Sequence, residues 1–84
     1  MTPAEIEREV QRRLRLPYHR VISGDDEQGY LGEVPELPGC LTAGETAAEA
    51  LTNLTEALAA WLESALKNGI AIPEPARGRV SVSA

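Results

Sequence analysis

The chain has 84 residues, which is enough for one domain with one hydrophobic core and too little for two. Its formal net charge is −5, and residues 21–66 carry nine carboxylates and neither lysine nor arginine, so this middle segment disfavours nucleic-acid binding and favours a basic partner. An acidic surface that only keeps the protein soluble is the alternative interpretation. The single cysteine, Cys40, excludes an intramolecular disulfide, and no apolar leader or membrane-spanning run is visible, so we expect a cytoplasmic protein.

Residues 1–16 are predicted to form an N-terminal helical extension. Thr2 can cap this helix, Pro3 suits its first position, and Glu5 completes a capping box. Three apolar residues spaced four apart form a thin stripe that can pack on the domain or on a neighbouring subunit. They are Ile6, Val10 and Leu14. The helix also carries a cluster of arginines, for which pairing with Glu5 and Glu9 is favoured over contacts with phosphate. They are Arg8, Arg12, Arg13 and Arg15.

A β-hairpin is predicted after this helix. Its strands cover residues 18–23 and 30–34, and residues 24–29 form a polar, glycine-bounded turn between them. Two prolines then interrupt the sheet, because proline cannot donate a backbone hydrogen bond. A short third strand is predicted over residues 40–43.

The strongest helix signal lies between Thr46 and Gly69. Thr46 is the expected N-cap, with Glu49 closing a second capping box, and Asn68-Gly69 supplies a left-handed C-terminal cap. Apolar residues recur at the helical spacing i, i+3, i+4 and i+7, which predicts a buried face. They are Ala47, Ala50, Leu51, Leu54, Ala57, Leu58, Trp61, Leu62 and Ala65.

The last predicted element is a strand near the C-terminus. Residues 77–83 alternate polar and apolar side chains, with Val80 and Val82 on the apolar face. The order helix, three strands, helix and strand predicts an α+β domain over residues 17–84, preceded by the helical extension of residues 1–16. In this domain a three-stranded antiparallel sheet is packed by one long helix, and the C-terminal strand is added to it.

No catalytic, metal or cofactor site is predicted. One histidine and one cysteine cannot supply the three or four ligands of a zinc site. A nucleophilic pair of Cys40 and His19 lacks any supporting motif, so a buried structural thiol is the preferred interpretation. The acidic residues Asp25, Asp26 and Glu27 can hold a divalent cation only loosely, and a solvated turn is favoured. We therefore do not expect an enzyme.

The segment 34–40 suits protein recognition, because its two prolines hold the backbone stiff and little conformational entropy is lost on binding. Leu37 either projects from this segment or tucks into the core, and the sequence leaves both open. The predicted partner-binding surface combines the acidic hairpin with the proline segment. Its residues are Asp25, Asp26, Glu27, Tyr30, Glu33, Glu36 and Leu37.

A homo-oligomer, either a dimer or a tetramer, is also predicted, because a domain this small has a modest core. Trp61 either closes that core or stands at a subunit interface. The candidate interface residues are Ile6, Val10, Leu14, Trp61, Val80 and Val82.

Several motifs, taken in their order and spacing, resemble the HicB family of antitoxins. The matching stretches are the first strand from Tyr18, Gly29-Tyr30, Val34-Pro35-Glu36-Leu37-Pro38-Gly39-Cys40, the run from Gly44 to Ala57, Trp61-Leu62, Gly69 and Ile72-Pro73-Glu74-Pro75. The resemblance covers residues 18–75.

The resemblance implies a degenerate ribonuclease-H-like fold without the acidic metal site of that fold. It also implies a small basic partner, the HicA toxin, which cleaves mRNA and is neutralised when the antitoxin covers its RNA-binding and catalytic surface. Many family members carry a C-terminal DNA-binding domain, for which this chain is too short, so DNA binding is not expected unless the N-terminal helix provides it. Two alternatives stay open: a stand-alone homo-oligomeric binding or scaffold module without a toxin, and a metal-dependent nuclease.

Overall fold

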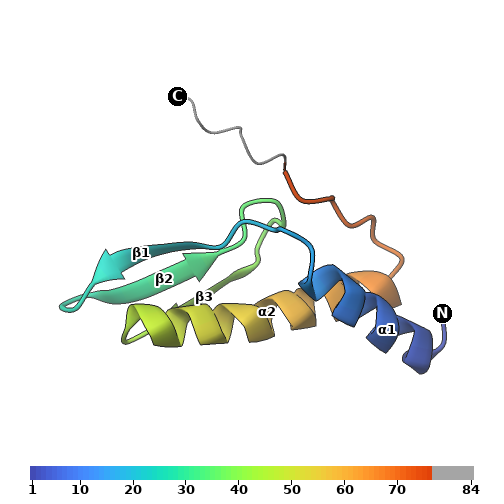
Figure 1. The fold of residues 1–84 in the computed structure, drawn as a ribbon, viewed down its shortest axis with the longest axis horizontal. Helices are drawn as coiled ribbons and strands as arrows, with labels where there is room; N and C mark the ends of the chain where they lie inside the picture. Colours follow the sequence, from blue (N-terminus) through green and yellow to red (C-terminus); the bar gives the residue numbers. More distant parts are fainter. Residues whose placement is uncertain (77–84) are drawn as a thin grey trace.

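The structure, a computed structural model, describes residues 1–76 (Figure 1). Its elements in chain order are α1 (Pro3–Leu14), β1 (Val21–Asp25), β2 (Gly29–Glu33), β3 (Leu41–Gly44) and α2 (Ala47–Lys67). The strands form one antiparallel sheet in the order β1-β2-β3. The long helix α2 runs along one face of the sheet, and α1 lies at the end of the molecule opposite the β1-β2 turn (Figure 1).

This arrangement confirms the predicted α+β class, with one long helix on a three-stranded antiparallel sheet and an extra N-terminal helix. The predicted C-terminal strand with Val80 and Val82 lies outside the described residues. No helix within residues 1–76 is long and apolar enough to cross a membrane.

Both helices begin at the predicted caps. The Thr2 hydroxyl accepts a hydrogen bond from the Glu5 amide at 3.1 Å, and the Thr2 amide donates to the Glu5 carboxylate at 2.7 Å, so the first capping box is complete. At α2 the Thr46 hydroxyl accepts from the Glu49 amide at 3.0 Å. The Glu49 carboxylate, however, accepts from the amide of Glu45 and not from that of Thr46. The second predicted capping box is therefore only half formed.

The first strand begins later than predicted. It was expected over residues 18–23, whereas β1 starts at Val21. Tyr18 and His19 hold other segments instead: the buried Tyr18 hydroxyl donates to the Pro73 carbonyl at 2.7 Å, and the His19 ring contacts the Glu36 carboxylate. Tyr18 thus joins the connector before β1 to the segment after α2, and His19 joins the same connector to the segment between β2 and β3.

Glycine at two positions allows α2 to approach the sheet closely. A Cβ added at Gly44 on β3 would lie 2.5 Å from the Ala50 nitrogen and 2.9 Å from its Cα, so no larger residue fits without moving the start of α2. A Cβ at Gly32 on β2 would first meet the side-chain tip of Ile22 at 3.2 Å. Gly32, Gly44 and Ile22 therefore mark the face of the sheet that α2 covers.

One hydrophobic core fills the space between α2, α1 and the covered face of the sheet. From α2 it takes three fully buried leucines, which are Leu54, Leu58 and Leu62. Ile6 and Val10 join them from α1, so the apolar stripe of α1 packs on its own domain. The predicted apolar face of α2 is wider than the sheet that covers it. Leu51 is consequently 44% exposed.

Candidate protein-binding surface

The second face of the sheet is open. Side chains alternate between the two faces along a strand, so the neighbours of Gly32 and Gly44 point away from α2. The residues of this open face form two rows across the three strands: Val21, Glu33 and Leu41 in one, and Ser23, Leu31 and Ala43 in the next. Its three large apolar members are Val21 (44% exposed), Leu31 (43%) and Leu41 (55%).

Glu33 occupies the middle strand in the end row of the open face. It lies on the middle strand, with Val21 paired beside it on β1 and Leu41 on β3. Its side chain is half-buried, and it makes no ion pair with any other residue in the described part of the chain. The open face therefore combines apolar side chains with one carboxylate on its middle strand.

The hairpin tip, residues 25–29, adjoins the open face and is strongly acidic. One Asp25 carboxylate oxygen accepts from the amides of Glu27 (3.0 Å) and Gln28 (2.8 Å), which orders the turn. The Tyr30 hydroxyl donates to Asp26 at 2.7 Å, and this bond raises the pKa of Tyr30. A hollow of about 380 Å³ at the tip is lined by Asp26, Glu27, Gln28, Gly29 and Glu45. The predicted acidic hairpin is thus exposed and held in one shape.

The proline segment is a folded corner and not a projecting arm. The Leu37 amide donates to the Val34 carbonyl and the Cys40 amide to the Leu37 carbonyl, each at 3.0 Å. Leu37 is only 1% exposed, and the Trp61 indole nitrogen donates to the Pro38 carbonyl at 2.9 Å. Of the two interpretations of Leu37, the structure shows the one in which it tucks into the core. A side chain so buried offers no surface to a partner.

Glu36 is also taken up by the fold. Its carboxylate, 7% exposed, accepts from the His19 ring at 2.7 Å, from the His19 amide at 3.2 Å and from the Ala76 amide at 3.0 Å. Burial alone would raise the pKa of Glu36, but these hydrogen bonds outweigh it and lower the pKa. Glu36 therefore joins the connector before β1 to the segment after α2. Among the predicted contact residues, the acids of the hairpin tip and Glu33 remain exposed or half-exposed.

The structure gives no support to a reactive Cys40–His19 pair or to a metal centre among the described residues. Cys40 is buried, and burial raises the pKa of its thiol more than the nearby Arg20 lowers it, which disfavours the reactive thiolate. The His19 ring is engaged with Glu36. Within residues 1–76 no three potential ligands from histidine, cysteine, aspartate and glutamate come together as a metal site.

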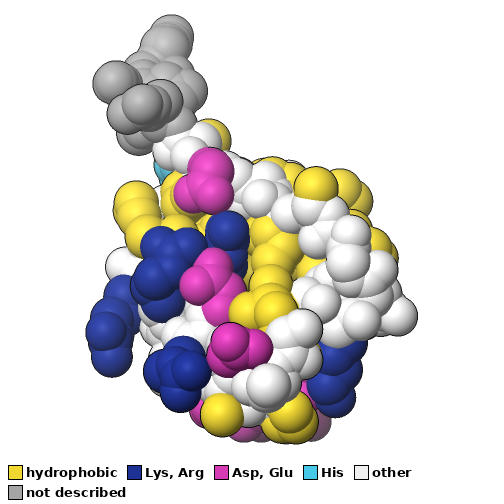
Figure 2. Space-filling model, turned by 90° about the vertical axis from the view of Figure 1, so that its right-hand side faces the viewer, with side chains coloured by type: hydrophobic (Ala, Val, Ile, Leu, Met, Phe, Trp, Pro, Cys, Tyr) yellow, Lys and Arg dark blue, Asp and Glu magenta, His cyan; other side chains and the backbone are white. Residues whose placement is uncertain are grey.

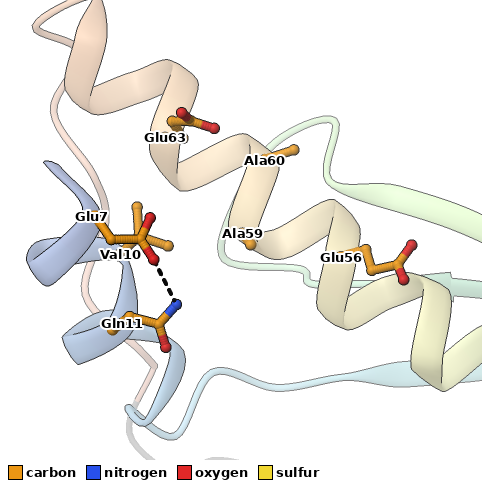
Figure 3. A pocket seen from close by; sticks show the side chains of 7 residues that line it. All are labelled: Glu7, Val10, Gln11, Glu56, Ala59, Ala60 and Glu63. Atoms are coloured by element: carbon orange, nitrogen blue, oxygen red, sulfur yellow. Dashed lines mark hydrogen bonds between the residues drawn. The ribbon is translucent and has the colours of Figure 1, made fainter. Parts of the chain in front are cut away.

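A groove of about 380 Å³ lies between the two helices (Figure 3). Glu7 and Gln11 of α1 form one wall, where the Gln11 amide donates to the Glu7 carboxylate at 3.3 Å. The other lining residues are Val10, Glu56, Ala59, Ala60 and Glu63. The small alanines of α2 create the groove, because they leave space where larger side chains would meet α1.

The predicted oligomer interface is only partly available. Ile6 and Val10 are buried within the protein, whereas Leu14 and Trp61 are half-buried and keep some exposed surface. The two valines of the predicted C-terminal strand lie outside the described residues. Homo-oligomerisation therefore stays a prediction.

Basic side chains gather at the end of the molecule formed by α1 (Figure 2). Arg12 and Arg13 both bind the Glu9 carboxylate at 2.8 Å, and together they lower the pKa of Glu9 to about 2, Arg12 contributing most. Arg13 also reaches Glu74 at 3.4 Å. The predicted pairing of arginines with Glu9 is confirmed, whereas Glu5 serves the helix cap instead. The arginines of α1 thus lie at one end of the molecule and the acidic hairpin at the other.

Comparison with known proteins identifies the class. The family model described as HicB_like antitoxin of bacterial toxin-antitoxin system matches residues 18–81, and the chain belongs to this family. The UPF0150 protein Ta0767 of Thermoplasma acidophilum is 39% identical over 69 residues, which cover 82% of this chain and all of that protein. The UPF0150 protein ssl0259 of Synechocystis is 39% identical over 58 residues, covering 69% of this chain and 80% of its own length. No solved structure matches the chain.

Proposed function

We propose that this chain is the antitoxin of a toxin–antitoxin pair and that it binds and occludes a small, basic, mRNA-cleaving toxin of the HicA type in the cytoplasm. Membership of the HicB-like antitoxin family supports the antitoxin role. The observation that carries the partner's chemistry is the exposed acidic hairpin end, where Asp26, Glu27 and Glu45 line one hollow without a basic neighbour among them. Opposite charge favours encounter and correct orientation of such partners.

The proposed mechanism is steric, and no bond is made or broken. An antitoxin that covers the RNA-binding surface of the toxin keeps mRNA from its catalytic residues. The contact surface comprises Glu33 and the hairpin tip, with Glu45 beside the tip. Glu36 and Leu37 then act indirectly, since they fix the corner that ends β2 and begins β3.

The test is direct inhibition. The gene next to the one for this chain is examined for a HicA-type toxin, that toxin is purified and mixed with a labelled mRNA, and cleavage is followed as this chain is added. We expect cleavage to stop near a stoichiometric ratio and the two proteins to co-elute in size-exclusion chromatography. Unchanged cleavage at a large excess of the antitoxin, with no co-elution, would show that the chain is not the antitoxin of that toxin.

A further inference from the structure

The open face contains a carboxylate as well as apolar side chains, and together they indicate what kind of protein would cover it. In the row nearest the proline corner, Val21 and Leu41 flank Glu33, and the next row adds Leu31 on the same central strand. Side chains directly opposite on paired strands have Cβ atoms about 4.5–5.5 Å apart. The carboxylate of Glu33 is therefore flanked by apolar side chains on three sides, and a protein that covers this face removes water from it.

A second copy of this chain suits the open face poorly. Two copies stacked face to face would bring two Glu33 carboxylates into one water-excluded layer, and the open face holds no lysine or arginine to neutralise them. Burying unpaired charges of the same sign is strongly unfavourable. Glu33 thus acts against self-association through this face.

An arginine or lysine of a different protein matches the same face well. Such a side chain has an apolar stem and a charged head, so its stem can pack on Val21 and Leu41 while its head reaches Glu33. Arginine fits best, because its guanidinium can donate two parallel hydrogen bonds to one carboxylate. We propose that the open face is the docking site of the toxin and that Glu33 receives a basic side chain presented from an apolar patch of the toxin. This inference rests on the proposed function.

The size of the open face indicates how far the contact extends. A specific interface covers about 800 Å² on each partner, which is more than six side chains of a three-stranded sheet supply. The contact must therefore continue over a neighbouring surface. The hairpin tip adjoins the second row through Asp25 and Gly29, which pair with each other at the end of the β1-β2 ladder. The predicted hot spot is Glu33 with Leu31, and the acidic tip forms the polar rim.

Two substitutions with matched controls test this assignment. Glu33→Gln removes only the charge, and its control is Glu56→Gln on the exposed side of α2. Leu31→Ser removes an apolar side chain that is 43% exposed, and its control is Leu51→Ser, at which the leucine is 44% exposed. Affinity for the purified HicA-type toxin is measured by calorimetry, and thermal unfolding of each variant shows that it is folded. We expect Glu33→Gln and Leu31→Ser to weaken binding about tenfold or more each, and both controls to bind like the wild type.

The outcomes separate the two proposals. If the wild type does not bind the toxin, the proposed function fails. If the wild type binds and the open-face variants bind equally well, the function stands and the docking face is wrong. Light scattering of the free protein supplies a further check. If the free protein is a dimer and Leu31→Ser converts it to a monomer, the open face binds a second copy of this chain and the assignment is wrong.

Discussion

Replacing Gly44 by alanine tests the close approach between β3 and α2, on which the open and covered faces depend. The added Cβ would lie 2.5 Å from the Ala50 nitrogen and 2.9 Å from its Cα. Ordinary contacts between carbon atoms are about 3.5–4.0 Å, so the first turn of α2 must retreat by about 1 Å. Both clashing atoms belong to the backbone and cannot move aside by rotating a side chain. Overpacking of this kind costs about 1–3 kcal/mol, and we expect the upper end of that range.

The matched control is Gly32→Ala on the neighbouring strand. Its Cβ would first meet Ile22 Cδ1 at 3.2 Å, the movable end of a side chain, so we expect a change within about 1 kcal/mol. In a domain of this size about 1 kcal/mol shifts the melting temperature by roughly 4–8 °C. Gly44→Ala should therefore lower it by about 10–20 °C and Gly32→Ala by much less. Unfolding in urea, followed by circular dichroism and by Trp61 fluorescence, gives the free energies. Equal losses in the two variants would refute the argument from backbone contact.

Three further predictions concern the proline corner and the connectors. Leu37→Ala should destabilise the fold by about 2–5 kcal/mol, as expected for a buried leucine, whereas Leu41→Ala on the open face should change the free energy of unfolding by no more than about 0.5 kcal/mol. Both free energies are measured by unfolding in urea. A small effect of Leu37→Ala would contradict its place in the core. The pKa of Glu36 is lower in the fold than its ordinary value of 4.5, so its stabilising contribution is present above pH 4.5 and is lost as the pH falls through the lowered pKa. Glu36→Gln should accordingly flatten the fall in stability between pH 5 and pH 3 measured by denaturation at each pH, and an unchanged slope would contradict the hydrogen bonds assigned to this carboxylate. Tyr18→Phe removes the hydrogen bond that the hydroxyl donates to the Pro73 carbonyl and the one that it accepts from Arg13. It should cost about 1 kcal/mol and should speed proteolytic cleavage within residues 70–76, which mass spectrometry detects. Cleavage at the wild-type rate would show that the Tyr18 hydroxyl does not hold the connector.

Local signals in the sequence predicted the helices well. The caps at Thr2 and Thr46 and the apolar spacing of α2 depend on residues at most a few positions apart, and the structure confirms them. The first strand was displaced, because Tyr18 has strand-like character but is used by a contact with Pro73, more than fifty residues away. Such long-range use of a side chain leaves no periodic pattern.

The candidate surface was predictable only in part. The acidic hairpin follows directly from Asp25, Asp26 and Glu27, whereas the role of Glu33 depends on which face of the sheet α2 covers. Gly32 and Gly44 mark the covered face, because a Cβ at either position would meet α2 or the side chains packed beneath it. In the sequence both look like ordinary strand glycines. The expected contacts of Glu36 and Leu37 failed for a related reason: two prolines can make either an arm or a corner, and the bonds that form the corner join its own backbone.

The arginine-bearing helix α1 and the acidic turn lie at opposite ends of the longest dimension of the molecule, which is 43 Å (Figure 1). This separation of charge gives the molecule an electric dipole along its length. A cationic protein diffusing nearby meets a field that turns the strand end of the molecule toward it before contact. The association rate constant should therefore fall steeply as ionic strength rises, while the dissociation rate constant, governed by short-range packing, changes little.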